Sequence, residues 1–177
     1  MLSGVYGFAE TTSRLRHSRS TPKLKPFGMP TNYKPQKRGI PCHFTQKIGI
    51  KFAKKDDVTD RFKFLNKWKL LVPPAPIAGQ TDFSKPVGFY YDGNTRIAKP
   101  GECCTESFIV TGAFNSKEEV LSFKSYLFTK TVRFLLLQTV VSQHVNREKF
   151  MFIPHLPNPP WATVFFNSNF NRFYFRF

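Results

Sequence analysis

Acidic residues, cysteines and long apolar runs are all scarce in this sequence of 177 residues. The three cysteines are an odd number and form no Cys-x-x-Cys motif, which excludes a disulfide-rich secreted domain. No stretch approaches the roughly 18 consecutive apolar residues of a membrane-spanning helix. The first residues also lack the basic stretch and apolar core of a signal peptide, so we expect a cytoplasmic protein without a membrane partner.

The shortage of acidic residues leaves a large positive charge. Lys and Arg number 27 against 11 Asp and Glu, which gives a formal net charge of +16 and a pI near 10.0. Between Arg14 and Lys55 there are twelve basic residues and no acidic one. A compact domain with this charge repels itself unless a polyanion neutralises it. The basic stretch therefore predicts binding to a nucleic acid, with an inert solvated leader as the alternative.

The basic stretch also contains five prolines, so we expect it to be rich in loops. Phe27, Tyr33 and Phe44 lie among the charges, where rings can stack on bases while lysines and arginines contact phosphates. The predicted phosphate contacts of this segment are Lys25, Lys34, Lys37, Arg38, Lys47 and Lys51.

Beyond the basic stretch, the pattern changes from short strands to a helix. Apolar runs at residues 68–72 and 107–111 end at prolines and at a glycine, as strands do. Ser116 and Glu119 have the spacing of a capping box, and apolar residues then recur at helical intervals. The sequence predicts an α+β fold with a small mixed or antiparallel sheet and one long helix at about residues 116–140. Lys130 and Arg133 lie on the polar side of this helix and are two further predicted phosphate contacts.

The most specific short motif that could carry chemistry is Asn158-Pro159-Pro160-Trp161. Asn-Pro-Pro-aromatic is the catalytic loop of DNA methyltransferases that modify exocyclic amines, in which the Asn and a proline carbonyl accept hydrogen bonds from the target amine. These four residues are the catalytic candidates. The glycine-rich loop that would hold S-adenosylmethionine is missing, so we expect no cofactor and no catalysis in this chain alone.

Two pairs of possible metal ligands occur at Cys42-His43 and Cys103-Cys104. Adjacent residues rarely both reach one metal ion, because their side chains diverge. We therefore expect buried or free thiols here and no metal site.

Several segments occur in an order that is typical of one enzyme family. They are Lys25-Pro26-Phe27-Gly28-Met29-Pro30-Thr31, Pro100-Gly101-Glu102-Cys103-Cys104-Thr105-Glu106-Ser107-Phe108-Ile109-Val110, Ser125-Tyr126-Leu127, Arg133-Phe134-Leu135, Gln143-His144 and Phe150-Met151-Phe152-Ile153-Pro154. This order resembles the C-terminal, target-recognition region of adenine-specific DNA methyltransferases of type II restriction–modification systems. The resemblance covers about residues 24–161. It leaves a basic leader at 1–23 and an aromatic tail at 162–177. We expect the aromatic tail to be poorly ordered.

The resemblance implies a DNA-binding target-recognition fragment whose catalytic domain is absent. Its partner would be duplex DNA, with bases read by the span 80–96, and S-adenosylmethionine would belong to a parent or partner methyltransferase. A methyltransferase or endonuclease subunit is a further possible partner. Three alternatives stay open: a small DNA methyltransferase or restriction endonuclease, a basic RNA-binding module, and an inactive gene remnant.

Overall fold

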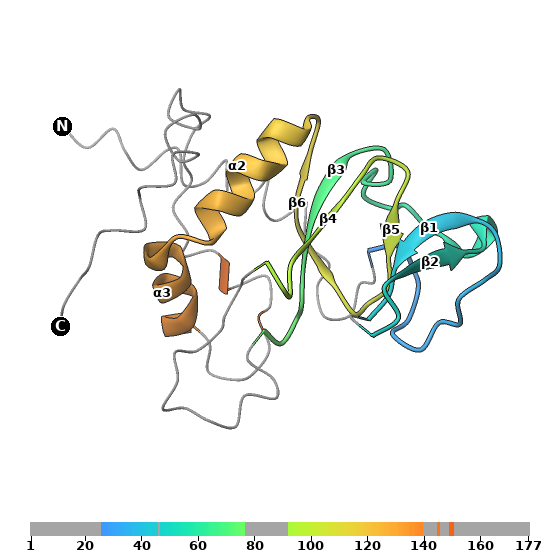
Figure 1. Cartoon of the computed structure of the whole chain (residues 1–177), viewed down its shortest axis with the longest axis horizontal. Coiled ribbons are helices and arrows are strands. Elements are labelled where there is room, and N and C mark those ends of the chain that lie inside the picture. Colours follow the sequence, from blue (N-terminus) through green and yellow to red (C-terminus); the bar gives the residue numbers. More distant parts are fainter. Residues whose placement is uncertain (1–25, 46, 77–91, 140–144, 146–148, 151–177) are drawn as a thin grey trace.

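The computed structural model describes residues 26–45, 47–76, 92–139, 145 and 149–150. In this part of the chain, six strands form two three-stranded sheets, and two α-helices follow the last strand (Figure 1). The α+β class predicted from the sequence is confirmed. The sequence predicted one sheet, and the structure has two. The last strand of the first sheet comes from a distant part of the chain.

The first sheet has the order β2-β1-β5. Its strands are β1 (Ile40–His43), β2 (Ile50–Ala53) and β5 (Cys103–Cys104), and a short 3-10 helix, η1 (Lys55–Asp57), follows β2. β1 pairs antiparallel with β2 and parallel with β5. Pro41 removes no hydrogen bond between β1 and β2, because Phe52 opposite it directs its backbone carbonyl outward to the amide of Gln36.

The second sheet is antiparallel and has the order β4-β3-β6. Its strands are β3 (Trp68–Val72), β4 (Arg96–Ala98) and β6 (Ile109–Phe114), so β3 has the bounds predicted from the sequence. The register shifts between Leu70 and Leu71, which leaves Thr111 of β6 as the extra residue of a β-bulge. The Thr111 hydroxyl donates to the Leu70 carbonyl at 3.2 Å.

The helical region begins as the sequence predicts. Ser116 caps α2 (Lys117–Leu127) by accepting a hydrogen bond from the Glu119 amide, and the Glu119 carboxylate accepts one from the Ser116 amide. This reciprocal pair satisfies two backbone N–H groups that have no partner within the helix. The capping box is therefore confirmed.

The expected single long helix is wrong, because the structure has two helices separated by two residues. α3 (Lys130–Thr139) follows α2 with Phe128 and Thr129 between them. The Thr129 hydroxyl donates to the Tyr126 carbonyl at 2.8 Å and accepts from the Val132 amide at 3.3 Å. Thr129 thus ends one helix and caps the next. Neither α-helix in the described part of the chain is long and apolar enough to cross a membrane.

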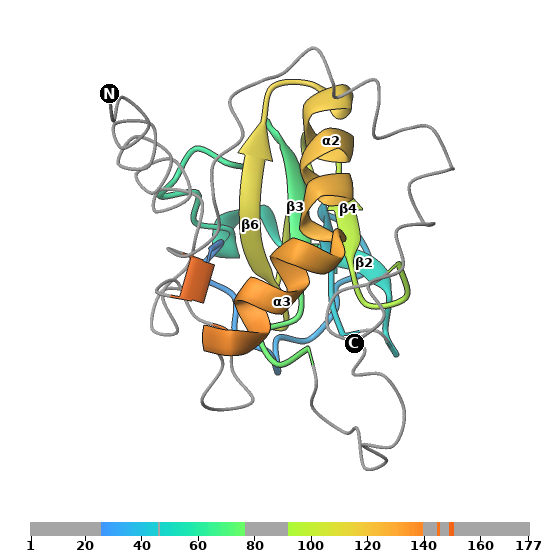
Figure 2. The same ribbon diagram turned by 90° about the vertical axis from the view of Figure 1, so that its left-hand side faces the viewer.

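The elements form three layers, with the second sheet in the middle (Figures 1 and 2). Alternation along β3 explains this arrangement: Leu70 and Val72 pack against the helices, whereas Leu71 packs toward the first sheet. The buried side chains between the second sheet and the helices include Leu70, Val72, Ile109, Val120, Leu127, Val132 and Leu136. Those between the two sheets include Phe27, Met29, Cys42, Phe44, Leu71, Ala98, Phe108 and Val110.

Candidate nucleic-acid interface

Five of the eight predicted phosphate-contacting residues lie together on the first sheet and the loop that leads into it. All five side chains are exposed, and within the described part of the chain none of them pairs with a carboxylate. They are Lys34, Lys37, Arg38, Lys47 and Lys51. We call residues 34–45 and 47–53 the basic hairpin; they comprise the loop before β1, the strands β1 and β2, and the described part of the turn between them.

The geometry of the basic hairpin depends on a glycine at its entry. Gly39 has a backbone φ of +143°, and a Cβ added there would lie 2.0 Å from the Ala53 carbonyl oxygen. Only glycine allows this close approach of the two strands. The amide of Gln36 donates to the Phe52 carbonyl at 2.9 Å, which places Lys37 and Arg38 beside the end of β2.

Tyr33 fastens the loop before β1 to the turn after β2. Its hydroxyl donates to Asp57 Oδ2 at 2.7 Å and accepts from the Lys54 amide at 3.1 Å. Its ring stacks on Phe44 with centroids 6.3 Å apart. Desolvation and the hydrogen bond to Asp57 raise the pKa of Tyr33.

The expectation that Phe27 and Phe44 stack on bases is wrong. Both rings are fully buried in the core between the two sheets. Phe44 follows the buried Cys42 by two residues, so both side chains lie on the face that packs against the second sheet. Ring-bearing residues in a basic segment can serve the core as readily as a ligand.

Exposed apolar side chains do occur on the basic hairpin, at positions that the sequence interpretation missed. Ile48 is 41% exposed, Ile50 is 55% exposed and Phe52 is 40% exposed. Ile50 and Phe52 alternate with Lys51 along β2, so they share one face of the strand. This alternation was the available signal, and it is typical of an edge strand with one face open.

The positive charge is concentrated on the side of the molecule that contains the basic hairpin. Residues 26–76 contain eleven Lys and Arg against three Asp. Residues 92–139 contain six basic and five acidic residues and are nearly neutral. Two of the basic residues there are Lys130, which is exposed, and Arg133, which is half-buried. Both belong to α3, at the end of the molecule opposite the basic hairpin (Figure 1).

The structure therefore separates the predicted phosphate contacts into a group of five and a distant pair. Lys25, the catalytic candidates Asn158, Pro159, Pro160 and Trp161, and the leader and tail lie outside the described residues. So does most of the predicted base-reading span, since only 92–96 of it is described. Asn94 and Thr95 in that part are buried and are closed to a base.

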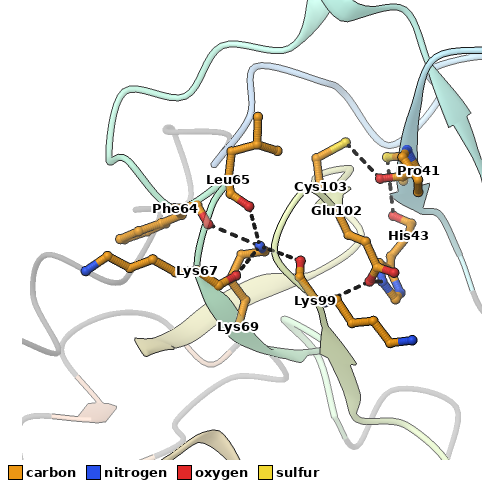
Figure 3. A network of polar contacts seen from close by, with 10 residues as sticks. Pro41, His43, Phe64, Leu65, Lys67, Lys69, Lys99, Glu102 and Cys103 are labelled. Carbon is orange, nitrogen blue, oxygen red and sulfur yellow. Dashed lines mark hydrogen bonds and ion pairs between the residues drawn. The ribbon is translucent and has the colours of Figure 1, made fainter. Parts of the chain in front are cut away.

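Beneath the basic hairpin, a polar network connects the two sheets (Figure 3). Its centre is Lys69 of β3, which is completely buried. The Lys69 ammonium donates to four backbone carbonyls, those of Phe64 at 3.1 Å, Leu65 at 3.0 Å, Lys67 at 2.6 Å and Lys99 at 3.0 Å. Burial lowers the pKa of Lys69 to about 8. The ammonium thus ties β3 to two separate loops.

The network continues through the turn before β5. Glu102 Oε2 accepts from the Lys99 amide at 2.8 Å and lies 2.9 Å from His43 Nε2. A carboxylate only accepts, so the Nε2–H of His43 is the donor. Desolvation lowers the pKa of His43, and Glu102 opposes this shift. The His43 side chain is only 4% exposed, so the pair positions β1 against the turn and is closed to a substrate.

The three cysteines meet where β1 lies beside β5, and all are buried and unpaired by disulfides. Cys42 is in register with Cys103, and His43 with Cys104. Paired residues share a face of a sheet and successive residues alternate, so the four side chains divide between two faces. The described residues accordingly contain no group of three His, Cys, Asp or Glu side chains placed to hold a metal ion. The hydrogen bond with Cys103 and burial raise the pKa of the Cys42 thiol.

Comparison of the chain with protein-family models, with curated proteins and with solved structures gives no match.

Proposed function

We propose that the chain binds DNA through the basic hairpin, as the target-recognition part of a restriction–modification system. The observation that carries the DNA-binding part is the group of five exposed basic side chains, Lys34, Lys37, Arg38, Lys47 and Lys51, on one rigid unit. Phosphates are contacted by exposed lysines and arginines that have no competing carboxylate.

The framework below supports this use of the surface. Tyr33, Gly39 and the polar network around Lys69 fix the backbone that carries the charges. A preorganised surface loses less conformational entropy when a ligand orders its side chains. The basic hairpin is thus suited to hold a DNA backbone in a defined position.

The restriction–modification role is supported by the sequence resemblance over residues 24–161. In this proposal the chain works in the cytoplasm on duplex DNA, beside a methyltransferase or endonuclease subunit that supplies S-adenosylmethionine binding or cleavage. The chain alone is not catalytic.

A charge-reversal experiment tests the DNA-binding part. A labelled DNA duplex is titrated with the wild type and with the triple variant Lys34→Glu, Lys37→Glu, Arg38→Glu, and binding is followed by fluorescence anisotropy. We expect the triple variant to lose about tenfold in affinity or more, since non-specific affinity comes from phosphate contacts. The matched control is Lys130→Glu with Arg133→Glu, which removes charge at the opposite end of the molecule.

Losses in proportion to the charge removed, six units in the triple variant and four in the control, would show that only net charge matters and would refute an interface at the basic hairpin. Stronger competition by an RNA duplex than by DNA would favour the RNA-binding alternative. Methyl transfer from labelled S-adenosylmethionine by the wild type, lost in Asn158→Ala, would show that the chain is an enzyme.

A further inference from the structure

We propose that the open face of β2, formed by Ile50 and Phe52 with Ile48 on the adjoining turn, contacts unpaired DNA bases. This inference rests on the proposed DNA binding and specifies its ligand: the preferred DNA contains a melted or single-stranded segment. The three side chains are 41%, 55% and 40% exposed in chain order, and they are the large apolar side chains of the first sheet that the structure leaves open.

The position of β2 in its sheet makes the contact possible. β2 is an edge strand, with β1 on one side and only the bridge between Gln36 and Phe52 on the other. Ile50 and Phe52 lie opposite His43 and Pro41 on the same face. Two neighbouring apolar side chains on a flat strand present a platform of the size that a base requires.

Charge identifies a nucleic acid as the occupant. Lys47 precedes the platform in the chain, Lys51 lies between Ile50 and Phe52, and Lys37 and Arg38 lie beside the Phe52 end. An apolar surface surrounded by lysines and arginines suits a ligand with flat apolar faces and a phosphate backbone. In a closed duplex the base faces are covered by stacking, so the platform reaches them only where the strands are separated.

The test compares two ligands that carry the same phosphates. One is an oligothymidylate, and the other is an abasic strand of equal length; both are fluorescently labelled. Wild-type protein should bind the oligothymidylate more tightly by about fivefold or more, because stacking on one ring is worth that factor at least. Phe52→Ala should remove this preference and leave the affinity for the abasic strand within about twofold.

Matched variants separate the contact from general damage. Phe134→Ala removes a phenylalanine that is 57% exposed on α3, far from β2, and should keep the preference for bases. Phe52→Tyr retains a ring and should keep it as well. If Phe52→Ala does not fold, Ile50→Thr provides the test, since threonine is β-branched and suits a strand.

Equal binding of both ligands by the wild type would refute the base contact while leaving phosphate binding intact. Failure of the wild type to bind either strand or the labelled duplex would instead refute the proposed function. A wild type that sediments as a dimer, and a Phe52→Ala variant that sediments as a monomer, would show that a second copy of the chain covers the platform, which also overturns the inference.

Discussion

Replacement of the buried Lys69 by methionine tests the polar network that supports the basic hairpin. Lys69→Met keeps a long, flexible side chain in the space but removes every N–H donor from the centre of the four carbonyls. Two effects then oppose each other. The carbonyls lose a donor, and the folded state no longer contains a charge that burial has taken out of water.

The structure gives the size of each effect. Three of the four carbonyls also accept an amide N–H, from Lys67, Gly101 and Glu102, so the loss falls mainly on the Lys67 carbonyl. One such buried acceptor without a donor costs about 1–3 kcal/mol. The lowering of the Lys69 pKa from 10.5 to about 8 corresponds to about 3 kcal/mol against the charged form. At neutral pH we therefore expect the free energy of unfolding of Lys69→Met to lie within about 1 kcal/mol of the wild-type value.

Raising the pH should separate the two proteins. In the folded state Lys69 loses its proton near pH 8, whereas the unfolded chain keeps it until about pH 10.5, so the unfolded state binds more protons in this window. Between about pH 8 and pH 10.5, the free energy of unfolding of the wild type should rise by up to about 3 kcal/mol relative to that of Lys69→Met. The raised pKa of the Cys42 thiol does not depend on Lys69, so it destabilises both proteins at high pH and cancels in the difference.

Urea unfolding of both proteins through this pH range measures the difference. Lys99→Met is the matched control, because Lys99 contributes its backbone carbonyl and amide to the network and not its side chain. A Lys69→Met variant that is severely destabilised at neutral pH, with a difference that shrinks as the pH rises, would refute the reasoning. It would show that the carbonyls stabilise the ammonium more than burial disfavours it.

Three further predictions concern single side chains. Gly39→Ala should lower the free energy of unfolding by at least about 2 kcal/mol in urea titrations and weaken DNA binding, because its Cβ would meet the Ala53 carbonyl oxygen. Ser116→Ala should cost about 1 kcal/mol in the same assay, since it removes the hydrogen bond to the Glu119 amide. The pKa of His43 is lowered in the folded state, so stability should fall as the pH drops below about 6.5, and His43→Gln should flatten that fall.

Local patterns in the sequence were sufficient for several elements. β3 lies at residues 68–72 because prolines follow an apolar run, and α2 begins where Ser116 and Glu119 form a capping box. The helix break was missed because it depends on the Thr129 hydroxyl, which competes with the backbone only once both helices are formed. The first sheet was missed because its strand β5 pairs with β1 across about sixty residues.

The candidate site divides in the same way. Exposure of the lysines and of Arg38 in the basic hairpin follows from their charge, which sequence reveals directly. The burial of Lys69 contradicts that rule, and it depends on four carbonyls that come from two separate segments. Phe44 is buried and Phe52 is exposed because they lie on opposite faces of the first sheet: Phe44 shares the face of Cys42, which packs against the second sheet, and Phe52 lies on the other face. Which face is covered is a tertiary property.

The salt dependence of DNA affinity tests the central claim most directly. If the five basic side chains of the hairpin region each contact a phosphate, log K should fall against log salt concentration with a slope of about −4.5. The triple variant Lys34→Glu, Lys37→Glu, Arg38→Glu should reduce this slope to about −2, and Lys130→Glu with Arg133→Glu should leave it near the wild-type value. An affinity that does not change with salt, or a slope that is reduced only by the α3 variant, would contradict DNA binding at the basic hairpin.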